Sequence, residues 1–120
     1  MTDQGVTKLQ LQLQAFASER DWEQFHTPKN LIMALMGEVG ELAEIFQWLT
    51  ADQAAEVMGD AVKADHVREE LADVFGYILR LADVLGVDLE KALLAKITSN
   101  DAKYPIEKSR GNAKKYTELK

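Results

Sequence analysis

The sequence contains no cysteine, and this absence excludes disulfides, thiolate catalysis and cysteine-ligated zinc sites. Long apolar runs are also missing, since the longest, Leu31–Met36, is far shorter than a membrane span. The first five residues, Met-Thr-Asp-Gln-Gly, contain neither a basic nor an apolar segment. We therefore expect a cytoplasmic protein without a signal peptide and without a membrane partner.

What remains is the composition of an ordinary soluble globular domain, with 120 residues of which 47% are hydrophobic and 28% charged. The net charge of −6 argues against nucleic acid polymers as partners. This charge is uneven, because residues 107–120 carry +3 and residues 1–106 carry −9. We therefore predict a helical domain over 1–106 and a basic tail over 107–120 that could close over a phosphate-bearing ligand. A solvated, mobile tail is the alternative interpretation.

The amino-terminal segment is the one place with a strand-like pattern. Residues 9–14 alternate leucine and glutamine, which is typical of a strand. The apolar residues Val6, Leu13 and Phe16 nevertheless follow helical spacing, and leucine, glutamine and alanine favour helices. Because no partner for a hairpin lies nearby, we predict a helix over residues 4–20.

Three further helices are expected, and short connections join them. They are predicted over about 28–48, 65–85 and 88–100, with a loop over 50–64 that could contain a helical turn. Thr27 and Pro28 are typical of a helix start, Gly86 of a helix end, and Asp88 of an N-cap. Four helices with short connections predict an all-α, antiparallel four-helix bundle.

The predicted helix over 65–85 is apolar on more than one side. Its apolar residues are Leu71, Val74, Phe75, Ile78, Leu79, Leu81, Ala82 and Leu85. A surplus apolar face of this kind is usually buried against another subunit. We therefore predict a homo-oligomer.

Two acidic pairs carry the chemical information in the sequence. Glu38 and Glu41 lie three residues apart in one predicted helix, and Glu70 and Asp73 lie three apart in another. Residues at this spacing are neighbours on a helix surface, where like charges repel each other. A divalent cation would make such a cluster favourable, and Mg²⁺ prefers oxygen ligands. We therefore predict a Mg²⁺ site, with Mn²⁺ able to substitute; a merely solvated acidic face is the alternative.

A di-iron site of the ferritin type is the obvious competitor for these acids. Such a site needs Glu-x-x-His ligand pairs. The two histidines are His26, ahead of the helix that carries Glu38 and Glu41, and His66, ahead of Glu70, and neither completes that pattern. Hard oxygen ligands around Mg²⁺ are therefore favoured.

Longer blocks of sequence resemble a known family. They are residues 16–26 (Phe-Ala-Ser-Glu-Arg-Asp-Trp-Glu-Gln-Phe-His), 37–48, 70–77 and 114–119. Together these blocks resemble the MazG-like all-α NTP pyrophosphohydrolases, and most of all the branch that acts on dCTP. The resemblance covers nearly the whole chain.

This resemblance implies an activity and an assembly. It implies Mg²⁺-dependent hydrolysis of dCTP and modified dCTP to the monophosphate and diphosphate, which would cleanse the nucleotide pool. It also implies a tetramer, with a dimer as the alternative, in which neighbouring subunits build each active site. Turnover of another dNTP such as dUTP, a nucleotide-binding oligomer without catalysis and a purely structural helical oligomer remain open.

Site residues are expected on both sides of the acidic pairs. Glu38, Glu41, Glu70 and Asp73 are the implied metal ligands, and a carboxylate free of metal, Glu41 first and Glu38 second, would act as general base. The resemblance places tryptophans 22 and 48 in the base pocket, although two tryptophans in a small bundle are more often core residues. The candidate substrate contacts in this part of the chain are Trp22, His26, Asn30, Trp48 and Tyr77. Asn30 could instead stabilise a helix start.

Basic and polar residues near the carboxyl end are candidate phosphate or sugar contacts. Lys96, Asn100 and Lys103 share one helix face, and Lys114, Lys115 and Tyr116 lie in the tail. In isolation, a solvated polar face explains the first group more simply.

Overall fold

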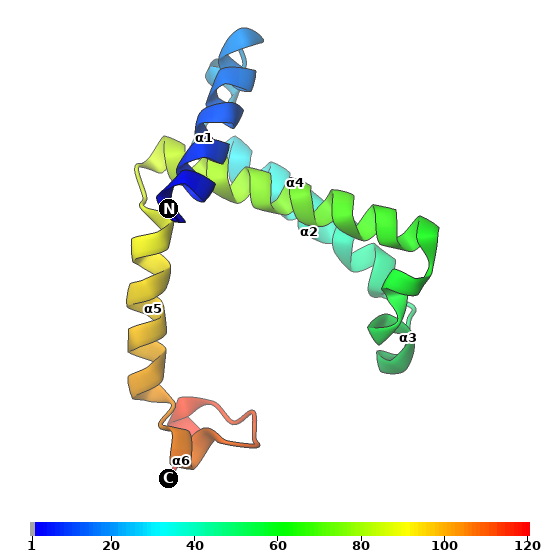
Figure 1. The fold of residues 1–120 in the computed structure, drawn as a ribbon, viewed down its shortest axis with the longest axis vertical. Helices are drawn as coiled ribbons and strands as arrows, with labels where there is room; N and C mark the ends of the chain where they lie inside the picture. The colour runs from blue at the N-terminus through cyan, green and yellow to red at the C-terminus, as the bar shows by residue number, and fades with distance from the viewer. Residues whose placement is uncertain (1) are drawn as a thin grey trace. The chain divides into compact units, whose positions relative to one another are not determined.

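The computed structural model describes residues 2–120, with side-chain environments from residue 5 onward. Regular structure in this range is helical, as the sequence predicts (Figure 1). The elements are α1 (Thr2–Glu19), the 3-10 turn η1 (Glu23–Phe25), α2 (Pro28–Phe46), α3 (Ala51–Ala55), the 3-10 turn η2 (Val57–Gly59), α4 (Ala61–Leu85), α5 (Leu89–Lys103), α6 (Ile106–Ser109) and the 3-10 turn η3 (Tyr116–Glu118). The helices of the described range are each too short or too polar to cross a bilayer.

The chain divides into two compact units, one that ends at Gly86 and one that begins at Val87. Gly86 ends α4 in the left-handed conformation, with a φ of 71°. Asp88 then caps α5, because its carboxylate accepts a hydrogen bond of 3.0 Å from the Lys91 backbone N–H. Both residues were predicted at these helix ends from their types alone.

The start of α4 differs from the sequence prediction. The helix begins at Ala61 and not at Asp65, because Asp60 supplies an earlier N-cap. The Asp60 carboxylate accepts hydrogen bonds from the backbone N–H groups of Val62 at 3.0 Å and Lys63 at 3.1 Å. These bonds satisfy donors that the first helical turn leaves without an intrahelical acceptor.

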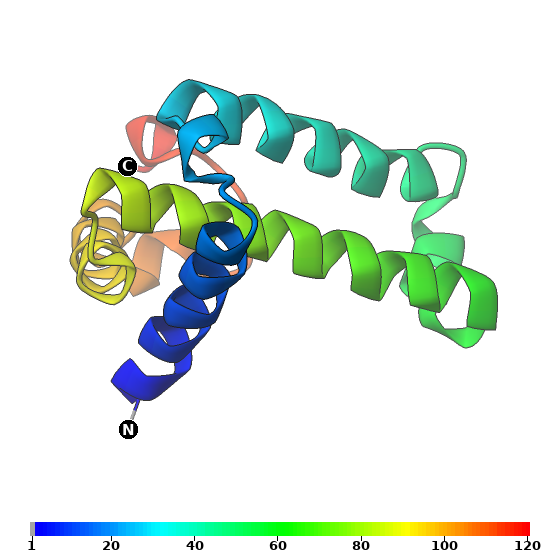
Figure 2. The ribbon, with the colours of Figure 1, turned by 90° about the horizontal axis from the view of Figure 1, so that it is seen from above.

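The first unit is built on α2 and α4, which lie side by side and run in opposite directions (Figure 2). The short elements α3 and η2 make the connection between them. The helix α1 crosses α4, and the Gln10 side-chain amide donates a 3.0 Å hydrogen bond to the Leu79 backbone carbonyl across this contact. The acidic pairs on α2 and α4 are therefore carried by helices that pack against each other.

The core of the first unit is small. Its buried apolar residues are Ala17, Leu31, Val57, Ala64, Val67, Leu79 and Ala82. Several large apolar side chains on the same helices stay exposed, among them Leu71 and Phe75 on α4. The packing of α1, α2 and α4 is thus established, whereas the four-helix bundle as a whole stays a prediction.

The second unit contains α5, α6 and the tail. Tyr116 of η3 packs edge-to-face against Tyr104, with ring centroids 6.1 Å apart. The Lys103 ammonium lies 5.0 Å from the centroid of the Tyr116 ring, a cation–π distance. The tail therefore returns to the end of α5 within this unit (Figure 1).

Candidate functional site

The packing of α2 against α4 brings three of the predicted acidic residues together. One carboxylate oxygen from each of Glu38, Glu41 and Glu70 lies within 4.8 Å of the others. We call these three residues the acidic trio. Glu38 and Glu41 are one helical turn apart on α2, and Glu70 meets them from α4.

The acidic trio lacks the partners that buried charges require. One oxygen of Glu38 and one of Glu70 are buried and accept no hydrogen bond within the described residues. Leaving buried carboxylate oxygens without a partner is costly, and a cation between them would remove that cost. All the available ligand atoms are carboxylate oxygens, which suit Mg²⁺ or Mn²⁺ better than softer metals. The residues therefore fit a hard divalent cation.

Proton sharing, burial and neighbouring acidic charges raise pKa values within the trio. The Glu70 carboxyl group, with which Glu38 can share a proton, raises the pKa of Glu38 to about 7, assisted by burial and by the charges of Glu41 and Asp73. The proton shared with Glu38 lowers the pKa of Glu70. Burial and the acidic neighbours Glu41 and Asp73 outweigh this effect, so the pKa of Glu70 is also raised overall. Without a cation, the trio therefore retains protons more readily than isolated glutamates do.

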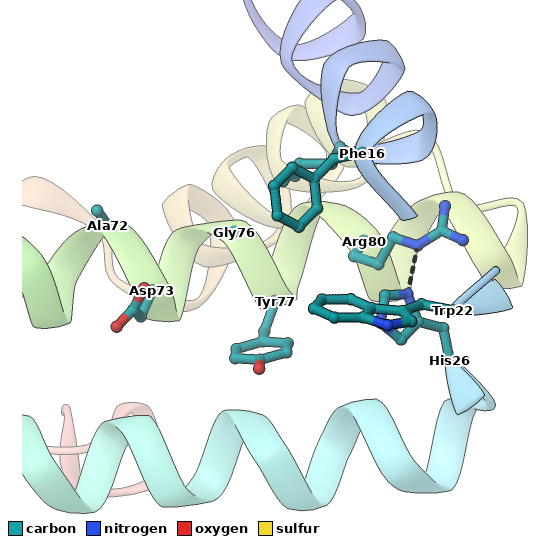
Figure 3. Close-up of a pocket in the computed structure, with 9 residues that line it drawn as sticks. Phe16, Trp22, His26, Ala72, Asp73, Gly76, Tyr77 and Arg80 are labelled. Carbon is teal, nitrogen blue, oxygen red and sulfur yellow. Dashed lines mark hydrogen bonds between the residues drawn. The ribbon is translucent and has the colours of Figure 1, made fainter. Parts of the chain in front are cut away.

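Asp73, the fourth predicted ligand, stands apart from the trio. Its carboxylate is not one of the oxygens that gather within 4.8 Å, although its charge acts on both Glu38 and Glu70. Asp73 extends from α4 toward α2 and lines a neighbouring pocket (Figure 3). It therefore connects the acidic trio to that pocket.

The pocket has a volume of about 270 Å³ and is mainly aromatic and apolar. Its lining residues are Leu13, Phe16, Trp22, His26, Ala72, Asp73, Gly76, Tyr77 and Arg80. Trp22 packs edge-on against Phe16, with centroids 5.7 Å apart, and against His26 at 6.4 Å. An aromatic wall of this kind can stack a flat ring, and Tyr77 lies one turn beyond Asp73 on the same helix. Three predicted substrate contacts, Trp22, His26 and Tyr77, thus line one pocket (Figure 3).

A charged cluster that sequence analysis did not predict lies at the end of this pocket. Arg80 is buried, with 7% of its surface exposed, and its Nε donates a 3.1 Å hydrogen bond to His26 Nδ1. Its Nη1 donates a 3.2 Å hydrogen bond to an Asp83 carboxylate oxygen. Burial lowers the pKa of His26, the Arg80 charge lowers it further, and Glu23 partly offsets both. Arg80 lies in the otherwise apolar segment 77–82, and a charge in such a segment could have indicated a buried, paired arginine from the sequence.

A second pocket, of about 390 Å³, borders the acidic trio itself. It is lined by Glu41, Glu44, Ile45, His66 and Glu70. In the sequence, His66 is notable only because it does not complete a di-iron pattern. The structure places this histidine beside two of the carboxylates, because it precedes Glu70 by one helical turn.

Two predicted contacts of the first unit, Trp48 and Asn30, do not line the pocket of Figure 3. Trp48 follows α2 and is 86% exposed, and it is absent from the pocket lining. The Asn30 side-chain amide donates a 3.0 Å hydrogen bond to the Phe25 carbonyl, and this bond stabilises the start of α2. The remaining predicted contacts, which are Lys96, Asn100, Lys103, Lys114, Lys115 and Tyr116, belong to the second unit. Their contact with substrate stays a prediction.

The chain is similar to known proteins in both sequence and fold. A sequence model of the MazG-like family matches residues 34–119. The chain is 48% identical over 104 residues, 87% of its length, to proteins named dCTP pyrophosphatase 1 from Bos taurus and Homo sapiens. It spans 62% and 61% of those two relatives, about three fifths of each. A crystal structure described as a pyrophosphatase from Archaeoglobus fulgidus matches with a TM-score of 0.77 and 40% identity, over 82% of this chain and 91% of that one.

Proposed function

The chain belongs to the MazG-like family, and from this premise we propose that it hydrolyses dCTP and modified dCTP to dCMP-type monophosphates and diphosphate, with Mg²⁺ as cofactor. The observation that carries the proposal is the convergence of three carboxylates within 4.8 Å beside an aromatic pocket. The names of the relatives, dCTP pyrophosphatase 1, support the choice of substrate. The biological role would be removal of surplus or modified deoxycytidine triphosphates from the nucleotide pool of the cytoplasm.

The acidic trio and Asp73 would hold the metal. When bound, a divalent cation would neutralise phosphate charge and lower the pKa of a bound water molecule. The trio offers the two buried oxygens that lack hydrogen bonds, and Asp73 offers a carboxylate on the pocket side. In this arrangement the triphosphate would lie by the acids while the base occupies the aromatic pocket.

The proposed reaction is attack of water on the α-phosphorus. A bond forms between the water oxygen and phosphorus, and the bond from phosphorus to the bridging oxygen of the diphosphate breaks. A carboxylate takes the proton that water releases and passes it to solvent. We propose Glu41 for this task, through an oxygen that does not hold the metal, because it is the exposed member of the trio and is accessible to water; Glu38 is the second choice.

Base binding would use the wall of the pocket of Figure 3. Trp22 would stack on the pyrimidine ring, a contact that contributes about 1–3 kcal/mol per base. His26 and Tyr77 would supply polar contacts from the same wall. Trp48 is exposed and outside this pocket, so its proposed place is in the base site of a neighbouring subunit.

We propose a homotetramer, with a dimer as the simpler alternative. Large apolar side chains are exposed on both units, including Leu71 and Phe75 on α4 and Leu93 and Leu94 on α5. Apolar patches of this kind are usually covered by another subunit. Lys96, Asn100, Lys103, Lys114, Lys115 and Tyr116 would then contact the sugar and triphosphate, within the same chain or from a neighbour.

Product analysis tests the proposal most directly. The protein would be incubated with Mg²⁺ and each of dCTP, 5-methyl-dCTP, dUTP, dATP, dGTP and dTTP, and the products separated. Monophosphate and diphosphate from the cytosine nucleotides are expected. Turnover of another nucleotide in place of dCTP would support the reaction and reject dCTP as the substrate. Release of nucleoside diphosphates and inorganic phosphate would reject attack at the α-phosphorus. Nucleotide binding without any product would favour a binding oligomer.

A further inference from the structure

The contacts of Arg80 determine what the His26 ring can do. The Arg80 guanidinium donates from Nε to His26 Nδ1 at 3.1 Å (Figure 3). It also donates from Nη1 to Asp83 at 3.2 Å. A guanidinium group has five N–H donors and no acceptor, and it remains charged in proteins. His26 Nδ1 must therefore act as the acceptor in this contact.

An accepting Nδ1 leaves only one form of the ring. A protonated imidazolium, or the tautomer with hydrogen on Nδ1, would place an N–H group against the Arg80 N–H. The compatible form is the neutral ring with its hydrogen on Nε2. The lowered pKa of His26, which results from burial and then from the Arg80 charge, agrees with a neutral ring.

The Nε2–H group is then the polar group of this ring that stays available to a ligand. Among the described residues, no hydrogen bond from His26 Nε2 to a protein acceptor is formed, and His26 lines the aromatic pocket. The side chains of Trp22 and Phe16 in that pocket carry no acceptor oxygen, and those of Asp73 and Tyr77, which also line it, form no hydrogen bond with His26 among the described residues. A ligand that fills the pocket can therefore supply the acceptor.

We propose that Arg80, held by Asp83, is a positioning residue that fixes His26 as a hydrogen-bond donor to an acceptor on the pyrimidine base. The inference rests on the proposed function, because that function supplies a pyrimidine as the ligand. A pyrimidine presents such acceptors on its ring edge, at the carbonyl oxygen and at the unprotonated ring nitrogen of cytosine. Asp83 contributes by keeping the buried guanidinium charge paired and in place.

The tautomer can be measured directly by long-range ¹H–¹⁵N NMR of the histidine rings. The chain has two histidines, so substitution of His66→Gln assigns both rings. We expect hydrogen on Nε2 and none on Nδ1 for His26 at neutral pH. Arg80→Met should convert this ring to a mixture of tautomers, since Nδ1 loses its donor. Hydrogen on Nδ1 in the unmodified protein, or an unchanged ring in Arg80→Met, would overturn the proposal.

Arg68 provides a matched control on the same helix. It is also an α4 arginine paired with an aspartate three residues away, at 3.1 Å from Asp65, but both side chains are exposed. Arg68→Met should leave the His26 ring unchanged. Arg80→Lys guards against a misfolded Arg80→Met, because it keeps the charge while a single ammonium lacks the fork that holds both partners. Arg80→Lys should shift the tautomer ratio of His26 in the same direction as Arg80→Met does, by a smaller amount.

Ligand binding then tests the contact with the base. Arg80→Met should raise KM for dCTP about 3- to 10-fold, the effect of one lost hydrogen bond, and leave kcat within about twofold. Binding of deoxycytidine, followed by tryptophan fluorescence, should weaken by a similar factor, and this measurement needs neither phosphate nor turnover. Unchanged deoxycytidine binding would overturn the proposal.

These readouts separate the two claims. A protein that hydrolyses no nucleotide but binds deoxycytidine in an Arg80-dependent way would reject the proposed function and retain the positioning role. Turnover of dCTP together with a His26 tautomer that does not change in Arg80→Met would retain the proposed function and reject the positioning role.

Discussion

Two polar clusters, to both of which α4 contributes, differ in how their charges are balanced. In the acidic trio, three carboxyl groups meet, and two buried carboxylate oxygens lack a hydrogen bond within the described residues. In the cluster of Arg80, Asp83 and His26, the buried cation has a carboxylate partner, and the neutral ring accepts a second hydrogen bond from the guanidinium. The first cluster needs a cation from outside the chain, whereas the buried charge of the second is already paired within the chain.

This difference separates a binding site from its support. Natural proteins bury unpaired polar atoms rarely, so an incomplete cluster indicates a ligand that completes it. A cluster whose buried charge is already paired instead holds one side chain in one state. The two clusters should therefore respond in opposite ways when a charge is removed from each.

Glu38→Gln should produce the largest effect. We expect activity with Mg²⁺ to fall about 100-fold or more, because a ligand to the cation is lost. The metal-free variant should melt at the same or a higher temperature than the unmodified protein, since repulsion within the trio decreases. Diphosphate release and thermal melting with and without Mg²⁺ measure both effects. Glu69→Gln, an exposed neighbour on α4, is the control, and a strongly destabilised metal-free Glu38→Gln would contradict the comparison.

Trp22→Ala should produce the next largest effect. Loss of base stacking should raise KM for dCTP about 10- to 100-fold, while release of diphosphate at saturation changes less. Trp48→Ala tests where the second tryptophan acts, since it is 86% exposed in the single chain. A KM effect in both variants indicates that a neighbouring subunit contributes Trp48. An effect of Trp22 alone would confine the base site to one chain, and no effect of Trp22→Ala would contradict the pocket assignment.

Asp83→Asn should lower the free energy of unfolding by about 1–2 kcal/mol, because the buried Arg80 charge loses its carboxylate. Asp65→Asn removes the equivalent partner of Arg68, where both side chains are more than half exposed, and should cost less than about 0.5 kcal/mol. Urea denaturation of both variants measures the difference. Equal losses would show that burial does not distinguish the two pairs.

The pH dependence of stability should be the smallest effect. The pKa of Glu38 is raised from 4.5 to about 7, so the folded state holds this proton more tightly than the unfolded state does. The stability that results is fully present below the unfolded pKa and is lost as the pH rises through about 7. The melting temperature of metal-free protein should therefore decline between about pH 5 and pH 8 more steeply than that of Glu38→Gln. Parallel curves for the two proteins would refute this origin of the slope.

Much of the local structure was predictable because short-range chemistry decides it. Thr27 with Pro28 at the start of α2 and Gly86 at the end of α4 act through neighbouring backbone groups. The start of α4 was predicted four residues late, because the Asp60 cap precedes residues that also suit a loop. The three-residue spacing of Glu38 and Glu41 placed them on one helix face without knowledge of the fold.

Long-range contacts account for what sequence analysis missed. Arg80 and His26 are 54 residues apart, and no local pattern joins them. Trp22 and Trp48 look alike as residues that flank α2, yet Trp22 lines the pocket and Trp48 is exposed.

The sequence by itself determined the helical class, most helix ends, the acidic pairs and the family, because these follow from residue type and spacing along one chain. Only the tertiary structure decided that Glu70 joins Glu38 and Glu41, as predicted, whereas Asp73 lies toward the pocket. It also decided that Arg80 is buried against His26. These arrangements depend on how α1, α2 and α4 cross, and crossing is set by packing between side chains distant in sequence.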